Sequence, residues 1–431
     1  MPATRKKIGW ANWSGNESAP SARVLQPQNE DELRLALLTA VQPIRVVGSG
    51  HSFTPIVSTS GTIINLDQMG GVVSTNPAAN AATLRAGGRL KDLSVELDSI
   101  NLAFRNLGDI NVQSFAGAAA TATHGTGQSL GCLASEITAV RLMLANGNIV
   151  EGTLEDNPDL VKAAQVSLGA LGVMLEATVR VCPAFNLHRR TWAEPIDAIL
   201  DAALVRWNTH RNFEFFYIPF SGYGINIAHD QTDASATERP PSEDEAGLAM
   251  IRSVRNKFKW STLLRRKLLA TGLKRMTAEN VVGPSAKLLA STRSTRFNEM
   301  EYHLPVESGL DVFREVVSYI EAKRRDVFFP IEVRKTAADE GWLSPFQNAP
   351  RISIAVHTAA EDSYDWLFDG IEPIFKAAGG RPHWGKLHSL GHNDFLALYP
   401  DFQKFIGLRK QLDPDGVFMT PAIARYWEEG Q

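Results

Sequence analysis

The placement of glycine constrains the fold of this chain more than any other feature of the sequence. Sixteen of its 33 glycines lie between Gly48 and Gly172, in under a third of the 431 residues. Seven of its nine tryptophans lie at or after Trp192, and none lies between Trp13 and Trp192. The sequence therefore predicts two unlike domains, as expected for a chain too long for one ordinary core.

Composition excludes several classes of protein. Hydrophobic residues make up 44% and charged residues 21%, which are ordinary globular values. A net charge of -3 offers no general attraction to nucleic acid or to anionic membrane. Only Cys132 and Cys182 are present, so no disulfide framework or cysteine metal cage is expected. The amino terminus lacks an apolar core and no run approaches the roughly 20 apolar residues of a membrane span, which favours a cytoplasmic protein.

Residues 23–183 read as short strands with helices between them. Apolar residues recur at helical spacing in EDELRLALLTAV, residues 30–41. Asn146 and Gly147 stand between two β-rich runs and predict a hairpin turn of the primed type, which argues against an all-parallel sheet. An alternating strand, EATVRVCP, ends at Pro183. We expect an α+β domain over residues 1–184.

The rest of the chain has a different pattern of residues, with longer strand-like runs and helical segments between them. FEFFYIPF, MEYHLP, FFPIEV and RISIAVH predict one antiparallel sheet, and the helical patterns between them predict helices on one of its faces. Residues 232–247 are polar and contain prolines, which predicts a loop. A second domain over residues 185–380 is expected.

Nine basic residues and no acidic ones lie in residues 252–275, beginning with Arg252 and ending with Arg275. A solvated helical surface is the ordinary interpretation of such a run. Weak docking of an acidic protein or of lipid headgroups is the alternative.

The segment RVVGSGHSF, residues 45–53, carries the first candidate site. A dinucleotide fingerprint would need a third glycine at position 53 and then a helix, but Phe53 stands there and TPIVSTSG is not helical. What remains is a turn whose amides can form a nest for an anion, with His51 at its tip.

Two further patches repeat this use of small residues. SFAGAAATATHGTGQSLG spans residues 114–131, and SLGALGV spans residues 167–173. A tightly packed helix followed by a glycine loop is one interpretation. Three patches in one domain favour a long ligand with several phosphate or ring contacts.

Charged residues supply a second set of candidates. Glu332 and Arg334 follow the apolar run VFFPI and alternate on a predicted strand, so they share one face. Lys386 in HWGK is a third candidate, and His357 at the end of RISIAVH is either a ligand-binding or a core histidine. Gly385 and Gly391 prevent histidines 383, 388 and 392 from sharing a helix face, so no metal site is expected.

Together, VVGSGHSF, ATATHGTG, SLGALGV, FPIEVR, RPHWGK and WANWSGN resemble the sugar-lactone oxidoreductases of the vanillyl-alcohol-oxidase superfamily of flavoproteins. The similarity covers nearly the whole chain and is strongest to bacterial L-gulono-1,4-lactone dehydrogenases and D-arabinono-1,4-lactone oxidases, with alditol oxidases next. It implies an α+β, two-domain fold: a PCMH-type FAD-binding domain, an antiparallel-sheet cap domain, and a carboxy-terminal segment over residues 381–431 that returns to the flavin.

The resemblance also implies roles for single residues. His51 matches the histidine to which this family often attaches FAD covalently. The residues implied to hold the cofactor are Val47, Gly48, Ser49, Gly50, His51, Ser52, Gly108, Ser114, Gly117, Thr121, Thr123, His124, Gly125 and Val173.

On the substrate side the resemblance implies catalytic roles for Glu332, Arg334 and Lys386, with Asp109 and His357 as further substrate contacts. A sugar lactone would pass hydride from its carbinol carbon to flavin N5, giving an ascorbate-type product. Gly108 matches a position that is linked in this family to the access of oxygen to the flavin. Asp109 stands where alditol oxidases have a serine. Both O2 and an electron-acceptor protein remain open as oxidants.

Three other functions stay open at this point. The first is an alditol oxidase that produces H2O2. The second is a nucleotide-binding module without catalysis, and the third is a peripheral membrane or scaffold protein that uses the basic stretch of residues 252–275.

Overall fold

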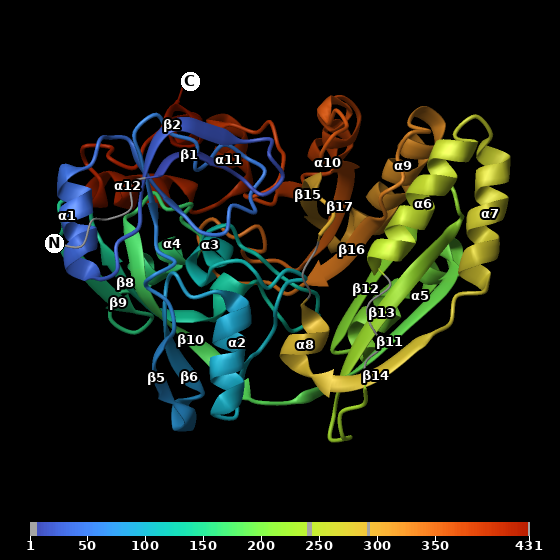
Figure 1. Cartoon of the computed structure of the whole chain (residues 1–431), viewed down its shortest axis with the longest axis horizontal. Coiled ribbons are helices and arrows are strands. Elements are labelled where there is room, and N and C mark those ends of the chain that lie inside the picture. Colours follow the sequence, from blue (N-terminus) through green and yellow to red (C-terminus); the bar gives the residue numbers. More distant parts are fainter. Residues whose placement is uncertain (1–6, 239–243, 291–293, 430–431) are drawn as a thin grey trace.

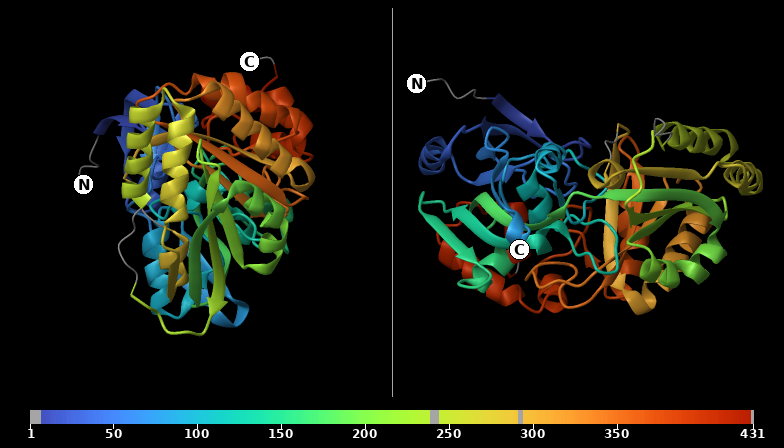
Figure 2. Two further views of the ribbon diagram at one scale, coloured as in Figure 1. Left: turned by 90° about the vertical axis from the view of Figure 1, so that its right-hand side faces the viewer. Right: turned by 90° about the horizontal axis from the view of Figure 1, so that it is seen from below.

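The chain folds into two lobes that lie side by side (Figure 1). The computed structural model describes residues 7–238, 244–290 and 294–429. Amino-terminal and carboxy-terminal elements build one lobe, and the middle of the chain builds the other (Figures 1 and 2). The predicted class, α+β with an antiparallel-sheet cap, is confirmed.

The first lobe begins with a small mixed sheet. Its strand order is β1 (Lys7–Ala11), β2 (Ser18–Leu25), β4 (Thr62–Asn65) and β3 (Ile44–Val47), and β4 runs parallel to both β2 and β3. Between β2 and β3 lies α1 (Glu30–Thr39), whose first turn is capped because the Asn29 side chain accepts a hydrogen bond from the Glu32 amide. The helix predicted here is confirmed.

A second, antiparallel sheet completes this lobe. Its order is β5 (Val72–Asn76), β6 (Ala81–Arg85), β10 (Val173–Pro183), β8 (Ile137–Met143) and β9 (Ile149–Thr153), and β7 (Leu102–Phe104) also pairs with β10. The helices of this part are α2 (Leu90–Ser99), α3 (Phe115–Ala120), α4 (Pro158–Gln165) and two short turns, η1 (Pro77–Ala79) and η2 (Leu133–Glu136).

The hairpin between β8 and β9 exists, but its predicted turn type is wrong. Leu144 and Asn148 are joined by a main-chain hydrogen bond, which leaves three residues in the loop instead of two. The Gly147 amide donates to the Leu144 carbonyl, and Gly147 has a φ of +80° while Asn146 has no positive φ. A type I turn followed by a left-handed glycine has this pattern, whereas a primed turn needs positive φ at its first central residue (type II′) or at both central residues (type I′).

The second lobe is built on one eight-stranded antiparallel sheet, as predicted. Its order is β14 (Glu279–Pro284), β11 (Asn186–Pro195), β13 (Tyr223–Thr232), β12 (Asn212–Ile218), β16 (Ile331–Thr336), β17 (Arg351–Ala359), β15 (Phe297–Pro305) and β18 (Arg381–Pro382). Every neighbouring pair is antiparallel.

Helices lie on both faces of this sheet, which corrects the prediction of one covered face. One face carries α5 (Ile196–Thr209), α9 (Val306–Lys323), the turn η3 (Leu367–Ile371) and α10 (Glu372–Ala377). On the other side are α6 (Asp244–Phe258), α7 (Thr262–Lys274) and α8 (Ser285–Leu289) (Figure 2). The predicted loop over 232–247 is wrong at its end, since residues 244–247 belong to α6; residues 239–243 lie outside the described residues.

The carboxy-terminal segment packs against the first lobe. It contains α11 (His392–Leu398), α12 (Phe402–Leu412) and α13 (Pro421–Trp427). The Ile44 amide donates to the Val417 carbonyl, and the buried Arg45 guanidinium donates to the Phe418 carbonyl at 2.8 Å. The boundary expected at residue 380 falls one strand early, because β18 still pairs with β15. The expected division at residue 184 lies in the link between β10 and β11 and stays a prediction.

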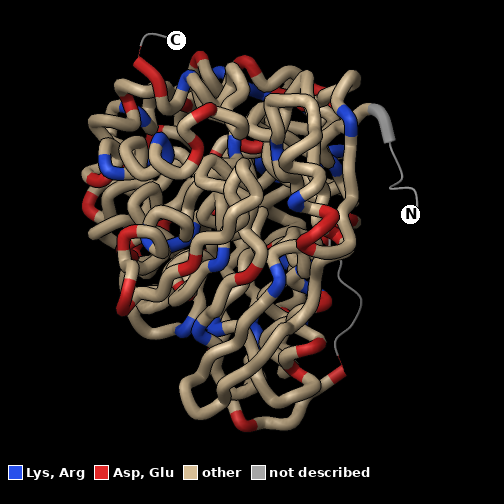
Figure 3. Tube along the Cα trace, turned by 90° about the vertical axis from the view of Figure 1, so that its left-hand side faces the viewer, with Lys and Arg blue, Asp and Glu red and all other residues tan. Residues whose placement is uncertain are grey.

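Charges are spread over the first lobe. On the side seen in Figure 3, basic and acidic residues are interspersed over the lobe. Among the described residues, none of the helices combines the length and the hydropathy that a membrane crossing requires.

Candidate active site

The three small-residue patches meet in one cavity of the first lobe. Most residues of the segments 45–52, 113–121 and 167–174 line it. Ten of the fourteen predicted cofactor residues lie on its wall: Val47, Gly48, Ser49, Gly50, His51, Ser52, Ser114, Gly117, Thr121 and Val173.

The wall of this cavity suits a long ligand held by main-chain groups. A Cβ on Gly48 would overlap the Ser114 side chain, and one on Gly117 would lie 2.8 Å from Ser114 Oγ. Gly50 has a φ of +70°, a conformation that favours glycine. These residues keep the loop of β3 against the start of α3 and leave amides at the cavity. The residues present therefore fit FAD, whose pyrophosphate needs close main-chain contact.

His51 lies where this cradle joins a second, larger cavity, since it lines both. Its ring stacks on Trp13, with centroids 4.9 Å apart and planes inclined by 26°. Burial, reinforced by the charges of Lys386 and Arg89, lowers the pKa of His51 to about 4. The ring is therefore neutral and nucleophilic at physiological pH.

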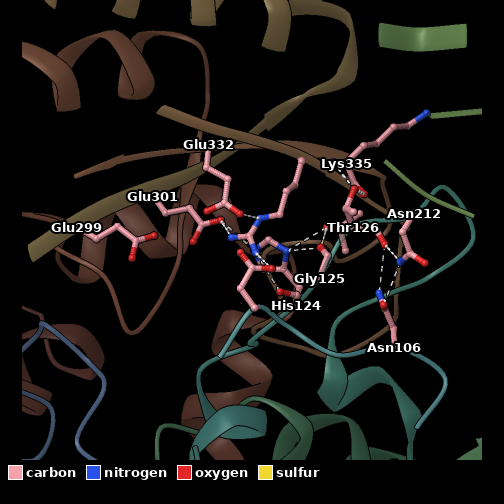
Figure 4. A network of polar contacts seen from close by, with 12 residues as sticks. Asn106, His124, Gly125, Thr126, Asn212, Glu299, Glu301, Glu332 and Lys335 are labelled. Atoms are coloured by element: carbon pink, nitrogen blue, oxygen red, sulfur yellow. Dashed lines mark hydrogen bonds and ion pairs between the residues drawn. The ribbon is translucent and has the colours of Figure 1, made fainter. Parts of the chain in front are cut away.

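A loop of the first lobe is bound to the sheet of the second lobe at this junction (Figure 4). The Gly127 amide donates to the Lys335 carbonyl at 2.7 Å, and the Thr126 hydroxyl donates to the Phe213 carbonyl at 2.5 Å. Asn212 donates to the Thr126 carbonyl at 2.6 Å. These bonds hold His124 against the charged residues of the second lobe.

The larger cavity has a volume of about 540 Å³ and two unlike halves. Near His51 and Lys386 its lining is charged. Farther along the sheet, between β12, β13 and helices α6 to α8, its lining is mostly apolar. The apolar part includes Phe216, Ile218, Ile225, Ile227, Leu248, Ile251, Leu269, Leu273, Leu288 and Leu289.

Arg334 is the centre of the charged half. Its Nη2 lies 2.8 Å from Oε1 of Glu301, its Nε lies 3.3 Å from Oε1 of Glu332, and its Nη1 donates to the His124 carbonyl at 3.3 Å. Asp109 lies 3.9 Å away on the other side. Glu332 and Arg334 share the cavity face of β16, as side-chain alternation predicts. The closest carboxylate partner of Arg334, however, is Glu301.

The carboxyl groups of this cluster have opposite pKa shifts. Burial would raise the pKa of Glu301, but Arg334 and His124 hold it well below its usual range. Burial raises the pKa of Glu332 well above its usual range, and Asp109 and Glu214 add to this against the effect of Arg334. Burial would lower the pKa of Arg334, but the carboxylates of Glu332 and Glu301 raise it. The surroundings therefore favour the ionised form of Glu301, while burial favours the protonated form of Glu332.

Lys386 and His357 meet at Glu299. The Lys386 ammonium is ion-paired with Oε2 of Glu299, and Nε2 of His357 lies 3.7 Å from Oε1 of the same residue. Nδ1 of His357 is 3.2 Å from the Pro330 carbonyl, which fixes the proton on Nδ1 and leaves Nε2 as an acceptor. Burial lowers the pKa of His357, although Glu299 opposes the shift.

Two predicted residues have surroundings that differ from the expectation. Gly125 lines neither cavity; a Cβ there would overlap the Leu107 carbonyl, so packing requires the glycine. Gly108 does line the larger cavity, but a Cβ there would lie 2.9 Å from the His124 carbonyl. The remaining predicted residues line the larger cavity: Asp109, Thr123, His124, Glu332, Arg334, His357 and Lys386.

Sequence reasoning missed the acidic residues of β15. Glu299, Glu301 and His303 alternate along this strand, and the first two line the cavity. Two acids and a histidine at every second position of an otherwise apolar strand were the signal. His383, which also lines the cavity, was considered only as a metal ligand.

The larger cavity also gathers groups of residue types that bind metals. In the described residues, Glu299, Glu332 and His357 form one such group, with ligand atoms within 4.8 Å of one another. The nearby cations already neutralise carboxylates of this region: Lys386 pairs with Glu299, and Arg334 pairs with Glu301.

Comparison with known proteins agrees with this geometry. The profile of the D-arabinono-1,4-lactone oxidase family matches residues 177–426, and a profile described as an FAD binding domain matches residues 21–153. The L-gulono-1,4-lactone dehydrogenase of Mycobacterium tuberculosis (strain CDC 1551 / Oshkosh) is 33% identical over 430 positions, covering 96% of this chain and 98% of that protein. The L-gulonolactone oxidase of Bos taurus is 31% identical, covering 97% and 98%.

Solved structures show the same fold. A solvent-stable cholesterol oxidase superposes with a TM-score of 0.77 at 17% identity, covering 97% of each chain. Fold, cradle and profiles together define an FAD-dependent oxidoreductase with a cap over the flavin side. The chain belongs to the D-arabinono-1,4-lactone oxidase family, within the vanillyl-alcohol-oxidase superfamily.

Proposed function

We propose that this enzyme oxidises a sugar 1,4-lactone of the L-gulono, L-galactono or D-arabinono type to an ascorbate-type product. The names of the relatives given above state that they oxidise lactones of this kind. The observation that carries the proposal is the buried cluster of Arg334, Glu301 and Glu332 beside the FAD cradle. It offers a fixed cation, Arg334, and two carboxyl groups whose pKa values are shifted in opposite directions to one small polar ligand.

FAD, when bound, supplies the acceptor for the hydride that leaves the carbinol carbon next to the lactone carbonyl. Arg334 is fixed by Glu301 and can stabilise negative charge on the substrate. Glu332, whose pKa burial raises, donates a hydrogen bond to a substrate oxygen when it is protonated. Such preorganised groups stabilise charge strongly because the site is buried.

The hydroxyl proton of the carbinol needs an acceptor. We assign this role to Nε2 of His357, because hydrogen bonding to Pro330 leaves that nitrogen unprotonated. Glu299 lies beside it and stabilises the charge that forms, and Lys386 is paired with the same carboxylate. In this proposal the flavin accepts the hydride and His357 accepts the proton.

A panel of substrates tests the proposal. The yellow holoenzyme is mixed anaerobically with aldonolactones and alditols, and air is then admitted. We expect lactones to bleach the flavin absorbance. Bleaching by xylitol or sorbitol alone would favour the alditol oxidase alternative, and no bleaching by either class would contradict the proposal. The rate at which colour returns in air separates O2 from another electron acceptor.

We also propose that His51 attaches FAD covalently. Its neutral ring, fixed against Trp13 at the junction of both cavities, supports this role. The denatured protein should keep yellow fluorescence on a gel, and His51→Ala should lose it. Release of all flavin from the denatured wild-type protein would contradict the attachment.

A further inference from the structure

Helices α6 and α7 form a hairpin on the outer side of the second lobe (Figure 2, left). It contains the basic stretch of residues 252–275. The inner face of the hairpin lines the larger cavity through Leu248, Ile251, Leu269 and Leu273. The proposed function does not account for the exposed basic and apolar side chains on its outer face.

Four arginines of the stretch attach the hairpin to the rest of the lobe. Arg252 pairs with Glu361, and Arg266 pairs with Glu321 at 2.8 Å. Arg255 donates to the Asp326 carbonyl at 2.6 Å. The buried Arg265 donates to the Arg325 carbonyl at 2.8 Å. These four are structural and are not available for a partner.

The other five basic residues are exposed. They are Lys257, Lys259, Lys267, Lys274 and Arg275. The ion pairs described for this part of the chain do not include Lys257, Lys259 or Lys267. The outer face of the hairpin therefore carries a cluster of positive charge on a molecule whose net charge is -3.

Large apolar side chains are exposed on the same face. Of the fourteen large hydrophobic residues exposed in the described part of the chain, five lie in residues 250–268. Trp260 is 68% exposed and Leu263 is 79% exposed. Met250 also lines the larger cavity, and the four that remain are Trp260, Leu263, Leu264 and Leu268.

The spacing places the three leucines side by side in one stripe on α7. Leu264 and Leu268 stand four residues apart with Leu263 and Lys267 beside them, and Trp260 lies in the turn just before the helix, which begins at Thr262. Lysine stems can lie along apolar surface while their ammonium groups reach a polar boundary. Tryptophan favours the interface between headgroups and acyl chains. Basic helices with this arrangement lie in the plane of membrane surfaces.

We propose that the outer face of the α6–α7 hairpin binds the surface of an anionic lipid bilayer. Protein interfaces are depleted in lysine, so a protein partner fits the face less well. A second copy of this chain would bring the same five cations against one another in a two-fold interface. The bilayer supplies both anionic headgroups for the lysines and an apolar layer for Trp260 and Leu263.

Vesicle sedimentation tests the proposal with the flavin-loaded protein. Vesicles of phosphatidylcholine with phosphatidylglycerol should bind it at low salt, and pure phosphatidylcholine vesicles should not. Binding should weaken at high salt. The triple variant Lys257→Glu, Lys259→Glu, Lys267→Glu should bind at least about tenfold more weakly, because each basic residue contributes to attraction by an anionic surface.

An apolar variant tests the stripe separately. Trp260→Ser with Leu263→Ser should bind about tenfold more weakly, since the buried apolar area sets interfacial affinity. The matched controls are Leu204→Ser with Val205→Ser on α5, which are also exposed, and Lys91→Glu with Lys410→Glu on α2 and α12. Both controls should bind as the wild type does. Circular dichroism verifies that each variant is folded.

Three results would overturn the proposal. The first is failure of the wild type to bind anionic vesicles, or binding by both hairpin variants that is as tight as that of the wild type. The second is tight binding to polyglutamate that does not depend on Trp260 and Leu263, which would assign the face to an acidic protein. The third is a wild-type dimer in solution that the Trp260→Ser, Leu263→Ser variant abolishes. None of these readouts requires turnover, so the proposal stands or fails apart from the lactone chemistry.

Discussion

At the scale of residues, the carboxyl groups in the charged half of the cavity have different surroundings, which shift their pKa values in opposite directions. Arg334 and His124 favour the ionised form of Glu301, while burial and neighbouring acids favour the protonated form of Glu332. A donor and an acceptor are thus available from the same residue type. Glu301 also joins the two lobes, because its Oε1 lies 3.0 Å from His124 of the first lobe.

Lys386 gives a direct test of charge at the flavin side of the cavity. Lys386→Met should slow reduction of bound FAD by substrate by about ten- to a thousandfold, given the effect of removing one electrostatic donor. Anaerobic stopped-flow absorbance measures this rate. Lys335→Met is the matched control, because Lys335 is also mostly buried but does not line the cavity. Unchanged reduction in Lys386→Met would remove this residue from the mechanism.

His357 gives a test by pH. Its pKa is lowered from 6.5, so the base form persists below the pH at which an ordinary histidine is protonated. The rate of flavin reduction should stay constant through neutral pH and fall only below pH 6.5. His357→Gln should lose about 10²–10⁴ in this rate together with the acidic fall.

His188→Gln, at a half-buried histidine of β11 that does not line the cavity, is the control for that variant. A wild-type rate that falls with a midpoint above pH 6.5 would contradict the role, since protonation would then occur more easily than in water. An intact acidic fall in His357→Gln would assign the titration to another group.

At the scale of elements, strands and turns differed in how far the sequence predicted them. Alternation placed Glu332 and Arg334 correctly on one face of β16. The partner of Arg334 could not be found this way, because Glu301 lies on β15 and the two strands are separated by β17. Strand order is a long-range property, and the spacing within one strand does not encode it. The Asn146–Gly147 turn failed for a local reason, since one additional residue in the loop changes the turn type.

The β8–β9 turn makes a stability prediction. Gly147→Ala should lower the free energy of unfolding by about 1–2 kcal/mol, because φ is +80° and a non-glycine residue is strained there. The new Cβ would also lie 2.8 Å from Cγ of Arg34. Urea denaturation measures the change.

Gly407→Ala, in α12, is the matched control. A Cβ there meets nothing within 4 Å, so alanine should raise the free energy of unfolding by about 0.5–1 kcal/mol through helix propensity. Equal effects of the two substitutions would contradict the conformational argument.

At the scale of the whole molecule, the uneven distribution of glycine predicted the two lobes. The glycine-rich segment forms the cradle, and the tryptophan-rich remainder forms most of the cap. The sequence does not show which residues line the larger cavity, because this depends on how the two lobes pack together. That packing depends on contacts such as the hydrogen bond from the Gly127 amide to the Lys335 carbonyl. The apolar half of the cavity could not be foreseen either, because the helical pattern of residues 244–289 does not show which face of the sheet these helices cover.

The central claim is that this cavity directs hydride from the carbinol carbon next to the lactone carbonyl to the bound flavin. Deuterium at that carbon tests it most directly. Anaerobic reduction of the flavin by L-gulono-1,4-lactone labelled at C2 should be slower than by the unlabelled lactone, while label at C3 should have no effect. Equal rates for all three lactones would mean that cleavage of this bond does not limit flavin reduction, and slowing by the C3 label alone would contradict the claim.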